Sequence, residues 1–391
     1  MSGVTPAPCP HRPPCPGCPR WGLAGPAPEQ LDALAALARE AGAPDPVLLA
    51  GEPLGWRRRA RLAVRGRANS PKLGIFREGS HDLVDVPRCL THHPAINEAA
   101  QALRAAIRAT GVAPYHEKAD RGLLRYAQIT AIPPESGADV EPGGTALQIV
   151  LVGNAEDPGA LAPLAAPLRE RLGDRLQGLF ANANPGRTNA ILGAEMLRLS
   201  GEEDFGARFG ASRVRVPPGA FFQANPELFA RAVERVQAAV PAGARVLELY
   251  AGVGTIGLGL AERASSLAME EIAPAARTGL ERGRAMLAPE LRERVEILAV
   301  PAEDAAPRVA GAEIVIADPP RRGLDPGVLA ALLTSPPRQL HLVACGFEAF
   351  LRDARALLAP GRLRLADLVA LDLFPMSGHV EVLARFDRVE A

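Results

Sequence analysis

The sequence predicts an α/β protein whose carboxyl-terminal part is a mostly parallel sheet with an antiparallel hairpin at its end, preceded by an α+β region. From residue 216 onward, short apolar runs alternate with segments of helical period, which is the pattern of a parallel sheet with helices on both faces. The chain has 391 residues, too many for one ordinary domain, and 48% of them are hydrophobic, enough for two cores. We therefore predict one domain over residues 1–215 and a second over residues 216–391.

Charge is distributed unevenly along the chain. The formal net charge is zero, but residues 1–130 contain 17 Lys and Arg against 11 Asp and Glu. A basic first part joined to a more acidic remainder favours an RNA-binding module attached to a catalytic one. No run reaches the roughly 18 apolar residues of a membrane span, and the first residues lack the pattern of a secretory signal. We expect a cytoplasmic, monomeric protein with no membrane partner.

Four of the five cysteines lie in the amino-terminal part. Three form a C-x5-C-x2-C cluster in a Pro-rich segment, and the fourth follows after 70 intervening residues: Cys9, Cys15, Cys18 and Cys89. In a reducing compartment such cysteines are more often metal ligands or nucleophiles than disulfides. Four thiolates can hold an iron–sulfur cluster or a tetrahedral zinc ion, and the spacing does not separate the two. Unliganded thiols are the third alternative, and nearby histidines leave open a mixed Cys/His zinc site: His11, His92 and His93.

A strongly basic segment runs from residue 53 to residue 77, with eight basic residues and no acidic one. At the two-residue period of a strand, five arginines share one face: Arg57, Arg59, Arg61, Arg65 and Arg67. The apolar residues at positions 60, 62 and 64 face the other way, into a core. Guanidinium groups this close repel one another unless anions lie between them, so we predict that this face grips the phosphate backbone of RNA. A merely solvated sheet face is the alternative.

The carboxyl-terminal alternation begins with a buried strand at 245–249, followed by a glycine-rich turn at 251–255. Glycine there lets the backbone approach a bound nucleoside, and we predict that a helix starts at Thr255. Glu270 lies 20 positions after Tyr250, at the end of the next apolar run, where a carboxylate suits a ribose diol. Further strands are predicted at 295–299, 313–317, 339–344, 362–373 and 379–386, with helices at 273–287 and 347–358.

Polar residues at the ends of these strands are predicted to meet at one rim of the sheet, where ligands bind in open α/β folds: Glu248, Glu270, Asp318 and Cys345. Cys345 directly precedes a helix, whose amino terminus would lower the pKa of the thiol and make it a nucleophile. A buried, inert cysteine is the alternative. Asp318 is followed by two prolines that stiffen its loop, which suits a hydrogen bond to a planar ligand. Glu381 is a second carboxylate near the rim, suited to accept a proton.

Taken in order, several pieces of the chain resemble the S-adenosylmethionine-dependent RNA 5-methyluridine methyltransferases (the RumA/TrmA type), and in particular the iron–sulfur members that modify 23S rRNA. The resemblance covers about residues 9–95 and 215–391. It rests on the four amino-terminal cysteines, Leu73–Cys89, Phe221-Phe222-Gln223-x-Asn225, Tyr250–Thr255, Asp318–Gly323, Cys345 with Arg352-Asp353, and Phe374-Pro375 leading to His379-Val380-Glu381. Each piece alone is weak, but their occurrence together in this order is specific.

The resemblance implies a Rossmann-like class I methyltransferase domain after an iron–sulfur and RNA-binding α+β region. It implies methylation of C5 of a uridine in RNA, with rRNA favoured over tRNA. Five residues would contact S-adenosylmethionine: Gln223, Tyr250, Thr255, Glu270 and Asp318. Cys345 would be the nucleophile and Glu381 the base, and the four amino-terminal cysteines would hold a 4Fe-4S cluster.

The chain departs from the family pattern at three places near the predicted pocket, one of which is the helix after Glu270, where Thr278-Gly279 and neighbours replace an Asn-rich stretch. Gly346-Phe347 stands where Asn-Pro is usual, and Pro301 stands where an acidic residue is usual.

Two rival interpretations of the whole chain remain. One is a methyltransferase that modifies an amino group or a cytosine, which would be expected to show Asn/Asp-Pro-Pro-Tyr/Phe or a Pro-Cys motif, and Asp318-Pro319-Pro320-Arg321 does not match either. The other is a non-catalytic iron–sulfur RNA-binding protein. Such a protein would not need both Cys345 and Glu381.

Overall fold

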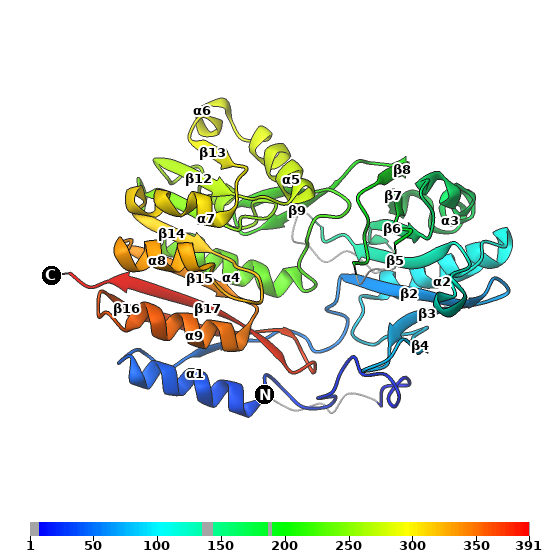
Figure 1. The fold of residues 1–391 in the computed structure, drawn as a ribbon, viewed down its shortest axis with the longest axis horizontal. Coiled ribbons are helices and arrows are strands. Elements are labelled where there is room, and N and C mark those ends of the chain that lie inside the picture. Colours follow the sequence, from blue (N-terminus) through cyan, green and yellow to red (C-terminus); the bar gives the residue numbers. More distant parts are fainter. Residues whose placement is uncertain (1–7, 135–143, 187–189, 391) are drawn as a thin grey trace. The chain divides into compact units, whose positions relative to one another are not determined.

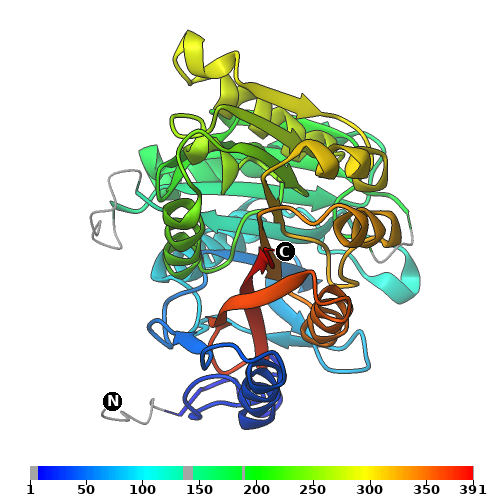
Figure 2. The same ribbon diagram turned by 90° about the vertical axis from the view of Figure 1, so that its left-hand side faces the viewer.

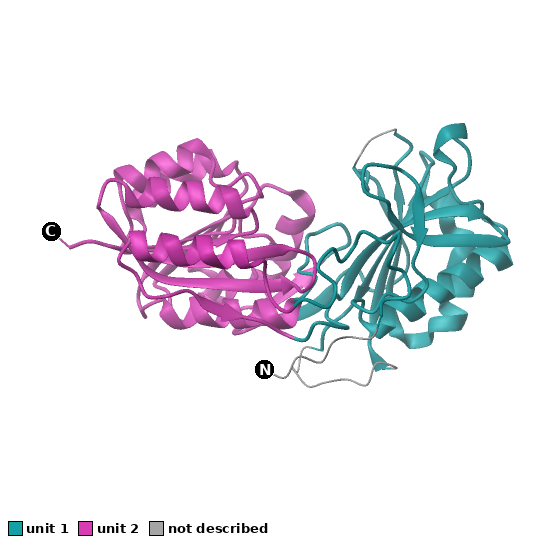
Figure 3. Ribbon diagram, turned by 90° about the horizontal axis from the view of Figure 1, so that it is seen from below, with its two compact units in different colours: residues 1–23, 52–207, 217–225 teal, residues 24–51, 208–216, 226–391 magenta. Residues whose placement is uncertain are grey.

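The computed structural model describes residues 8–134, 144–186 and 190–390, which fall into two compact units (Figure 3). Unit 1 takes its residues from 1–23, 52–207 and 217–225, and unit 2 from 24–51, 208–216 and 226–391. The predicted single boundary at 215/216 differs from this division, because residues 24–51 add a helix and a strand to unit 2 while residues 217–225 belong to unit 1. Among the described residues, no helix is both long and apolar enough to cross a membrane.

Unit 2 is built around an eight-stranded sheet in the order β1-β16-β17-β15-β14-β11-β12-β13 (Figure 1). Strands β11 to β15 are parallel to their neighbours among themselves, and β17 runs antiparallel to both β15 and β16. This confirms the predicted mostly parallel sheet with an antiparallel hairpin. Figure 2 shows β17, in red, beside β16, in orange. The hairpin lies one strand in from the edge, because the short strand β1 pairs in parallel with β16.

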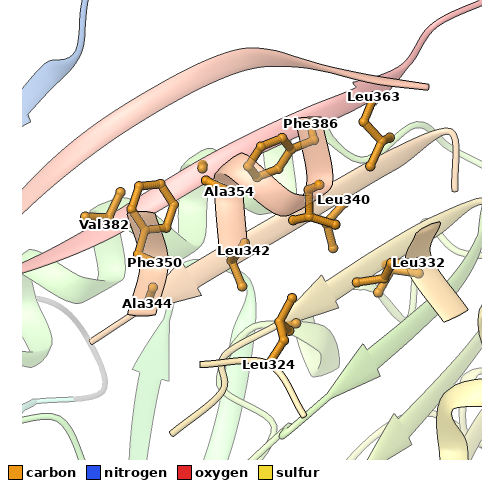
Figure 4. Packing of buried hydrophobic residues seen from close by; sticks show 14 of the residues in the cluster. Leu324, Leu332, Leu340, Leu342, Ala344, Phe350, Ala354, Leu363, Val382 and Phe386 are labelled. Carbon is orange, nitrogen blue, oxygen red and sulfur yellow. The ribbon is translucent and has the colours of Figure 1, made fainter. Parts of the chain in front are cut away.

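The elements of unit 2 have these bounds: α1 Pro28–Glu40, β1 Val47–Leu49, β10 Ser212–Val216, α4 Pro226–Ala239, β11 Arg245–Leu249, η5 Gly257–Leu260, β12 Ser266–Glu270, α5 Pro274–Ala285, α6 Pro289–Arg292, β13 Val295–Leu298, α7 Ala302–Ala305, η6 Ala306–Gly311, β14 Ile314–Ala317, α8 Pro326–Thr334, β15 Gln339–Ala344, α9 Phe347–Leu358, β16 Leu363–Phe374 and β17 His379–Arg388. An apolar cluster lies between the sheet and helices α1, α8 and α9, and includes Leu342, Phe350 and Phe386 (Figure 4). Because the sheet has helices on both sides (Figure 3), its parallel strands are buried and only their ends are open to ligands.

The glycine-rich turn after β11 does not lead into the predicted α-helix. Residues 252–256 form turns, and only the four-residue 3-10 helix η5 follows. A Cβ at Gly257 would collide with the carboxylate of Glu248, so this position requires glycine. Glycine also occupies positions 254 and 259, and glycine is a poor helix former. The glycines leave this stretch of backbone without side chains, and they also prevent a regular helix.

Unit 1 contains a seven-stranded sheet in the order β4-β3-β2-β5-β6-β7-β8, antiparallel except for the pair β6 and β7. Its elements have these bounds: β2 Arg59–Arg67, β3 Ser70–Phe76, β4 Leu83–Asp85, α2 Pro94–Thr110, η1 Glu117–Ala119, β5 Leu124–Ala131, β6 Leu147–Gly153, η3 Pro158–Leu164, α3 Ala165–Leu172, η4 Gly173–Arg175, β7 Leu176–Ala183 and β8 Met196–Gly201. Helices α2 and α3 bury Ile96 and Leu168 against Leu62 and Val64 of β2, on one face of this sheet. Strands β9 (Phe205–Phe209) and β10 form a separate two-stranded sheet.

Candidate active site

The turn after β11 is held by hydrogen bonds to carboxylates. Tyr250 has a left-handed backbone, with φ of 59°; its N–H donates to Oε2 of Glu270 at 3.0 Å, and its hydroxyl donates to Oδ2 of Asp325 at 2.9 Å. Gly252 also has φ of 59°, and its N–H donates to Oε2 of Glu271 at 2.9 Å. A Cβ at Gly252 would have no neighbouring atom within 4 Å. Hydrogen bonds to carboxylates thus hold the turn in place, while the space beside Gly252 contains no other protein atoms. A nucleoside can therefore approach the backbone closely there.

Two buried carboxyl groups lie at the ends of β11 and β12. Oε2 of Glu248 accepts a hydrogen bond from the N–H of Gly257 at 3.1 Å, and burial, together with the charges of Asp318 and Glu271, raises its pKa well above the usual range. Burial also raises the pKa of Glu270 to about 7, with the charge of Glu271 acting in the same direction. A carboxyl group with this pKa is partly protonated at neutral pH, so it can both donate to and accept from a ribose hydroxyl.

Strand register places Cys345 opposite Glu381. Ala344 of β15 pairs with Val382 of the antiparallel strand β17, so the next residue of the first strand faces the preceding residue of the second. Asp318 follows β14, the other neighbour of β15 in the sheet. The charges of Glu381 and Asp318 both act on the thiol of Cys345. The structure therefore brings three of the predicted residues together at one rim.

The thiol of Cys345 is half-buried and protonated at neutral pH in the free protein. Burial raises its pKa to about 11, and the charges of Glu381 and Asp318 act in the same direction, opposed in part by Arg321. The predicted lowering of this pKa by a helix amino terminus is therefore wrong, although α9 does begin two residues later. Burial and the two carboxylates outweigh the helix. The thiol must lose its proton as part of any reaction in which it is a nucleophile.

The two carboxyl groups beside this thiol differ in their readiness to ionise. Burial raises the pKa of Glu381 to about 7, although the charge of Arg321 opposes the shift. Burial and the charge of Glu381 raise the pKa of Asp318 well above its usual range. Asp318 therefore keeps its proton to a higher pH than an ordinary aspartate does, whereas Glu381 is about half ionised at neutral pH and can accept a proton.

The loop after β14 is held against helix α9. The N–H of Leu324 donates to Oδ2 of Asp353 at 2.8 Å, and Nε of Arg352 donates to Oδ1 of the same carboxylate at 2.9 Å. Gly346 permits a close approach of this loop, because a Cβ there would collide with the carbonyl oxygen of Arg321. Close packing against the loop after β14 therefore explains why residue 346 is glycine, where the family that this chain resembles usually has asparagine.

Gln223 and Thr255 complete the predicted cofactor-binding set. Gln223 lies in unit 1, where its side chain is buried and its Oε1 has no hydrogen-bond partner within the described residues. Thr255 lies half-buried in the turn between β11 and η5, in unit 2. The contact of either side chain with S-adenosylmethionine stays a prediction.

The four amino-terminal cysteines are free, half-buried thiols of unit 1. Burial raises the pKa of Cys18 to about 11, and the charges of Cys89, Cys15 and Cys9 add to the shift. Burial also acts to raise the pKa of Cys89, but a hydrogen bond and the charge of His92 help to lower it to about 6. In the part of the chain that the structure describes, no group of three or more Cys, His, Asp or Glu side chains is arranged to hold a metal ion. The four donors suit a thiolate-ligated group by their chemistry, but their arrangement is not that of a ligand shell.

The histidines near these cysteines make other contacts. Nε2 of His11 lies 2.9 Å from the carbonyl oxygen of Arg88. Nδ1 of His93 accepts a hydrogen bond from the N–H of Ala95 and so caps helix α2. Because Nδ1 of His93 accepts, Nε2 of its neutral ring carries the proton, which disfavours His93 as a zinc ligand. The contact of His11 does not disfavour that ring, since a metal-bound histidine commonly donates its other N–H to a backbone carbonyl.

The five arginines predicted to share one strand face lie in different environments. Arg59 is buried: its Nε donates to Oγ1 of Thr130 at 2.9 Å, its Nη1 donates to the carbonyl oxygen of Ala220 at 2.6 Å, and its guanidinium lies 5.2 Å from the ring centre of Phe222. Arg57 precedes β2 and experiences the charges of two cysteines. The prediction is therefore wrong for Arg59, which is a structural residue. The outer part of the strand carries the rest of the basic face: Arg61, Arg65 and Arg67.

Two acidic residues of the site were not predicted, Glu271 and Asp325. Glu271 accepts the hydrogen bond from the turn after β11, and Asp325 accepts the one from the hydroxyl of Tyr250. Each had a signal in the sequence. Glu271 directly follows the predicted Glu270, and Asp325 precedes Pro326, the usual arrangement at the start of a helix.

No protein-family model matches the chain. An uncharacterized RNA methyltransferase of Protochlamydia amoebophila is 33% identical over 352 residues, which are 88% of this chain and 89% of the relative. An uncharacterized RNA methyltransferase of Gloeobacter violaceus is 30% identical over 348 residues, 88% of this chain and 73% of the relative. The crystal structure of Pyrococcus abyssi tRNA (uracil-54, C5)-methyltransferase in complex with S-adenosyl-L-homocysteine matches with a TM-score of 0.73 and 25% identity, over 92% of this chain and 83% of that chain. An α/β methyltransferase fold and identity over most of both sequences lead to one conclusion: this chain belongs to a family of RNA methyltransferases.

Proposed function

We propose that this protein uses S-adenosylmethionine to methylate C5 of a uridine in RNA. The observation that carries the proposal is the placement of Cys345 opposite Glu381, with Asp318 directly after the neighbouring strand β14. Methyl transfer to a nitrogen or oxygen atom needs no thiol, whereas transfer to C5 of uracil needs both a nucleophile and a base. The similarity to a solved methyltransferase that acts on C5 of uracil-54 in tRNA supports the same reaction here.

The chemistry of uracil explains why a thiol is required. C5 of the ring is a poor nucleophile toward a methyl group on sulfur. When bound, S-adenosylmethionine supplies that electrophilic methyl group. The thiol of Cys345 gives its proton to solvent and its sulfur bonds to C6 of the ring, which moves electron density to C5. C5 then bonds to the methyl carbon, and the bond between that carbon and the sulfonium sulfur breaks with its electron pair remaining on the sulfur. S-adenosylhomocysteine is the leaving group, and the C6–sulfur bond remains.

The second half of the reaction releases the enzyme. The carboxylate of Glu381 accepts the proton of C5, the electron pair of that C–H bond restores the C5–C6 double bond, and the thiolate of Cys345 leaves. A pKa of about 7 suits Glu381 to accept a proton near neutral pH. Burial favours the protonated form of Asp318, and in that form it donates a hydrogen bond to a carbonyl oxygen of the ring.

The rim around the turn after β11 suits the nucleoside part of S-adenosylmethionine. Glu270, partly protonated, pairs with the ribose hydroxyls, and Tyr250 is held in place by its hydrogen bonds to Glu270 and Asp325. The open space beside Gly252 leaves room for the ligand. Gln223 and Thr255 complete the proposed contacts.

The substrate is RNA, and the target base is unpaired, because a base inside a duplex cannot reach a thiol. We favour rRNA on the resemblance of the motifs, and the tRNA specificity of the Pyrococcus abyssi enzyme makes tRNA the second candidate. Both pools are therefore included in the tests below.

We also propose that Cys9, Cys15, Cys18 and Cys89 hold a 4Fe-4S cluster of structural role. Four half-buried thiols whose charges act on one another are a suitable donor set, and the methyl transfer itself needs no electron. Cys18→Ser should remove the brown chromophore of protein purified without oxygen. A colourless wild-type protein that contains zinc would overturn this assignment.

The test of the reaction is covalent capture. RNA that contains 5-fluorouridine should form a stable adduct with the wild type, because fluorine at C5 cannot leave as a proton does, and Cys345→Ala should form none. Glu381→Gln should form an adduct with ordinary RNA, since it completes methyl transfer but cannot release the product. Asp304→Asn removes an exposed carboxylate of unit 2 and serves as the matched control. Capture that persists in Cys345→Ala would contradict the assignment of Cys345 as the nucleophile. Absence of capture in the wild type and every variant would favour a non-catalytic RNA-binding protein.

A further inference from the structure

A cavity of about 430 Å³ lies on the sheet of unit 1 and is lined by residues of β2, β3 and β5 among others. On β2 its lining residues are Arg61, Ala63 and Arg65, which alternate with the core residues Leu62 and Val64. Because successive side chains of a strand point to opposite faces, the cavity lies on the face that helices α2 and α3 do not cover. Its volume is within the range of about 300–1,000 Å³ that is usual for sites that bind small molecules.

The floor of this cavity is almost free of side chains. Ala63 pairs with Gly74 of β3 on one side and with Tyr126 of β5 on the other. Gly74 cannot be replaced by a larger residue, because a Cβ there would collide with the carbonyl oxygen of Val84. Ala63 and Gly74 are buried, and the carbonyl group of Val84 covers the sheet at Gly74, so the surface that the cavity offers to a planar group is the ring of Tyr126.

A fixed cation surrounded by aromatic rings forms one wall. The guanidinium of Arg65 lies 5.2 Å from the ring centre of Phe76, 5.5 Å from that of Tyr115 and 5.6 Å from that of Tyr126. It donates to the carbonyl oxygen of Val64 at 2.9 Å, so its position is set by the backbone. These contacts fix the position of the cation, and Glu117, at 3.5 Å from Arg65, offsets part of its charge.

A second cation at the cavity is exposed. Within the described residues, the one hydrogen bond of the Arg61 guanidinium runs from Nε to Oε1 of Gln128 at 2.8 Å. Its terminal nitrogens therefore remain available to a ligand. The acidic residue of the lining, Glu117, is already engaged with His81 at 2.6 Å and with Arg65 at 3.5 Å. The cavity thus offers donors to an anion next to a surface for an aromatic ring.

We propose that this cavity binds one unpaired nucleotide of the RNA substrate, away from the base that is methylated. Arg61 binds the phosphodiester, and the base stacks on the ring of Tyr126. Positive charge combined with aromatic rings is the composition of sites for single strands, since a base in a duplex has no free face to stack on such a wall. The inference rests on the proposed function only in taking RNA as the substrate.

The test measures binding of a fluorescein-labelled single-stranded RNA of ten nucleotides to full-length protein prepared without oxygen. Tyr126→Leu keeps an apolar side chain but removes the stacking surface, and should raise Kd by roughly five- to 100-fold, the loss of one base–aromatic stack. Tyr126→Phe, which keeps the ring, should restore most of that affinity. Arg61→Met should lower the slope of log Kd against log salt by about 0.7, the release of one counterion from a single strand. Arg169→Met, which removes an exposed charge from α3 on the covered face, is the matched control.

A second measurement uses only the wild-type protein, so its result does not depend on whether the variants fold. Ultraviolet cross-linking of the wild type to the same RNA, followed by peptide mass spectrometry, should attach a nucleotide to the peptides of β3 or β5 that carry Phe76 or Tyr126. Cross-links elsewhere only, with equal Kd values for Tyr126→Leu and Arg169→Met, would overturn the proposal. Binding of an acidic peptide in preference to the RNA would also overturn it. Because neither readout involves methyl transfer, failure of the methyltransferase assay with the cross-link present would count against the proposed function alone.

Discussion

Replacing Glu381 with glutamine tests whether the carboxylate opposite Cys345 controls the reactivity of the thiol. In the free protein the pKa of Cys345 is raised from 9.0 to about 11, first by burial and then by the charges of Glu381 and Asp318. Removing the first of these charges should lower the thiol pKa. The whole shift is about two units and has several causes, so we expect the variant to lower it by about one unit. At pH 8 this gives about tenfold more thiolate, because so small a fraction of the thiol is ionised in the wild type.

The assay is alkylation of the protein by iodoacetamide at pH 8, with the peptide that contains Cys345 quantified by mass spectrometry, since four other cysteines also react. Glu381→Gln should be alkylated at Cys345 about ten times faster than the wild type. At pH 6 the two proteins should react at nearly the same rate, because Glu381 has a pKa of about 7 and is then mostly protonated in the wild type as well. Asp304→Asn should match the wild type at both pH values. Equal rates for Glu381→Gln and wild type at pH 8 would refute the coupling on which the candidate site depends.

Three further predictions concern stability and packing. The pKa of Glu381 is about 7 in the folded protein and 4.5 ordinarily, so between these pH values the folded state binds more protons than the unfolded state. The free energy of unfolding should therefore fall by up to about 3 kcal/mol as pH rises from 4.5 to 7. Urea denaturation of Glu381→Gln should show no such contribution. Gly346→Ala should lower the free energy of unfolding by about 1–3 kcal/mol and reduce methyl transfer, because the new Cβ would displace the loop after β14. Gly327→Ala, in the first turn of α8, should leave stability unchanged or raise it. Equal melting temperatures for the two variants would contradict the packing argument. Arg59→Ala should lower the free energy of unfolding by about 1–3 kcal/mol, because it leaves buried hydrogen-bond partners unsatisfied. Arg67→Ala should stay within about 0.5 kcal/mol of the wild type. If thermal unfolding gives the reverse order, Arg59 is not a structural residue and the original prediction that it faces RNA stands.

The parallel sheet and the composition of its rim could be predicted because buried parallel strands are short apolar runs and the residues that follow them must share one edge. That reasoning grouped Asp318 with Cys345 without any knowledge of register. The pKa of Cys345 could not be predicted in the same way. It depends on burial and on Glu381, which the antiparallel strand β17 places opposite the thiol. The sequence placed Glu381 near the rim, but the strand pairing that sets this carboxylate opposite the thiol is not visible in a local pattern, whereas a helix amino terminus is.

The basic strand shows a similar limit. Alternation correctly separated Arg61 and Arg65 from the core residues between them, because this pattern is local. The burial of Arg59 depends on the carbonyl oxygen of Ala220, which lies 161 residues later in the chain. The edge strand β1 was missed for a comparable reason. It has three residues, and its place is fixed by pairing with β16 rather than by any periodicity of its own.

The central claim is methylation of C5 of uridine in RNA, and the most direct measurement follows the methyl group itself. Protein purified without oxygen is incubated with deuteromethyl S-adenosylmethionine and with unmodified rRNA or tRNA, and the RNA is digested to nucleosides for mass spectrometry. We predict labelled 5-methyluridine in one RNA pool with the wild type and none with Cys345→Ala. Labelled cytidine or adenosine, or labelled 5-methyluridine formed equally well by Cys345→Ala, would contradict it.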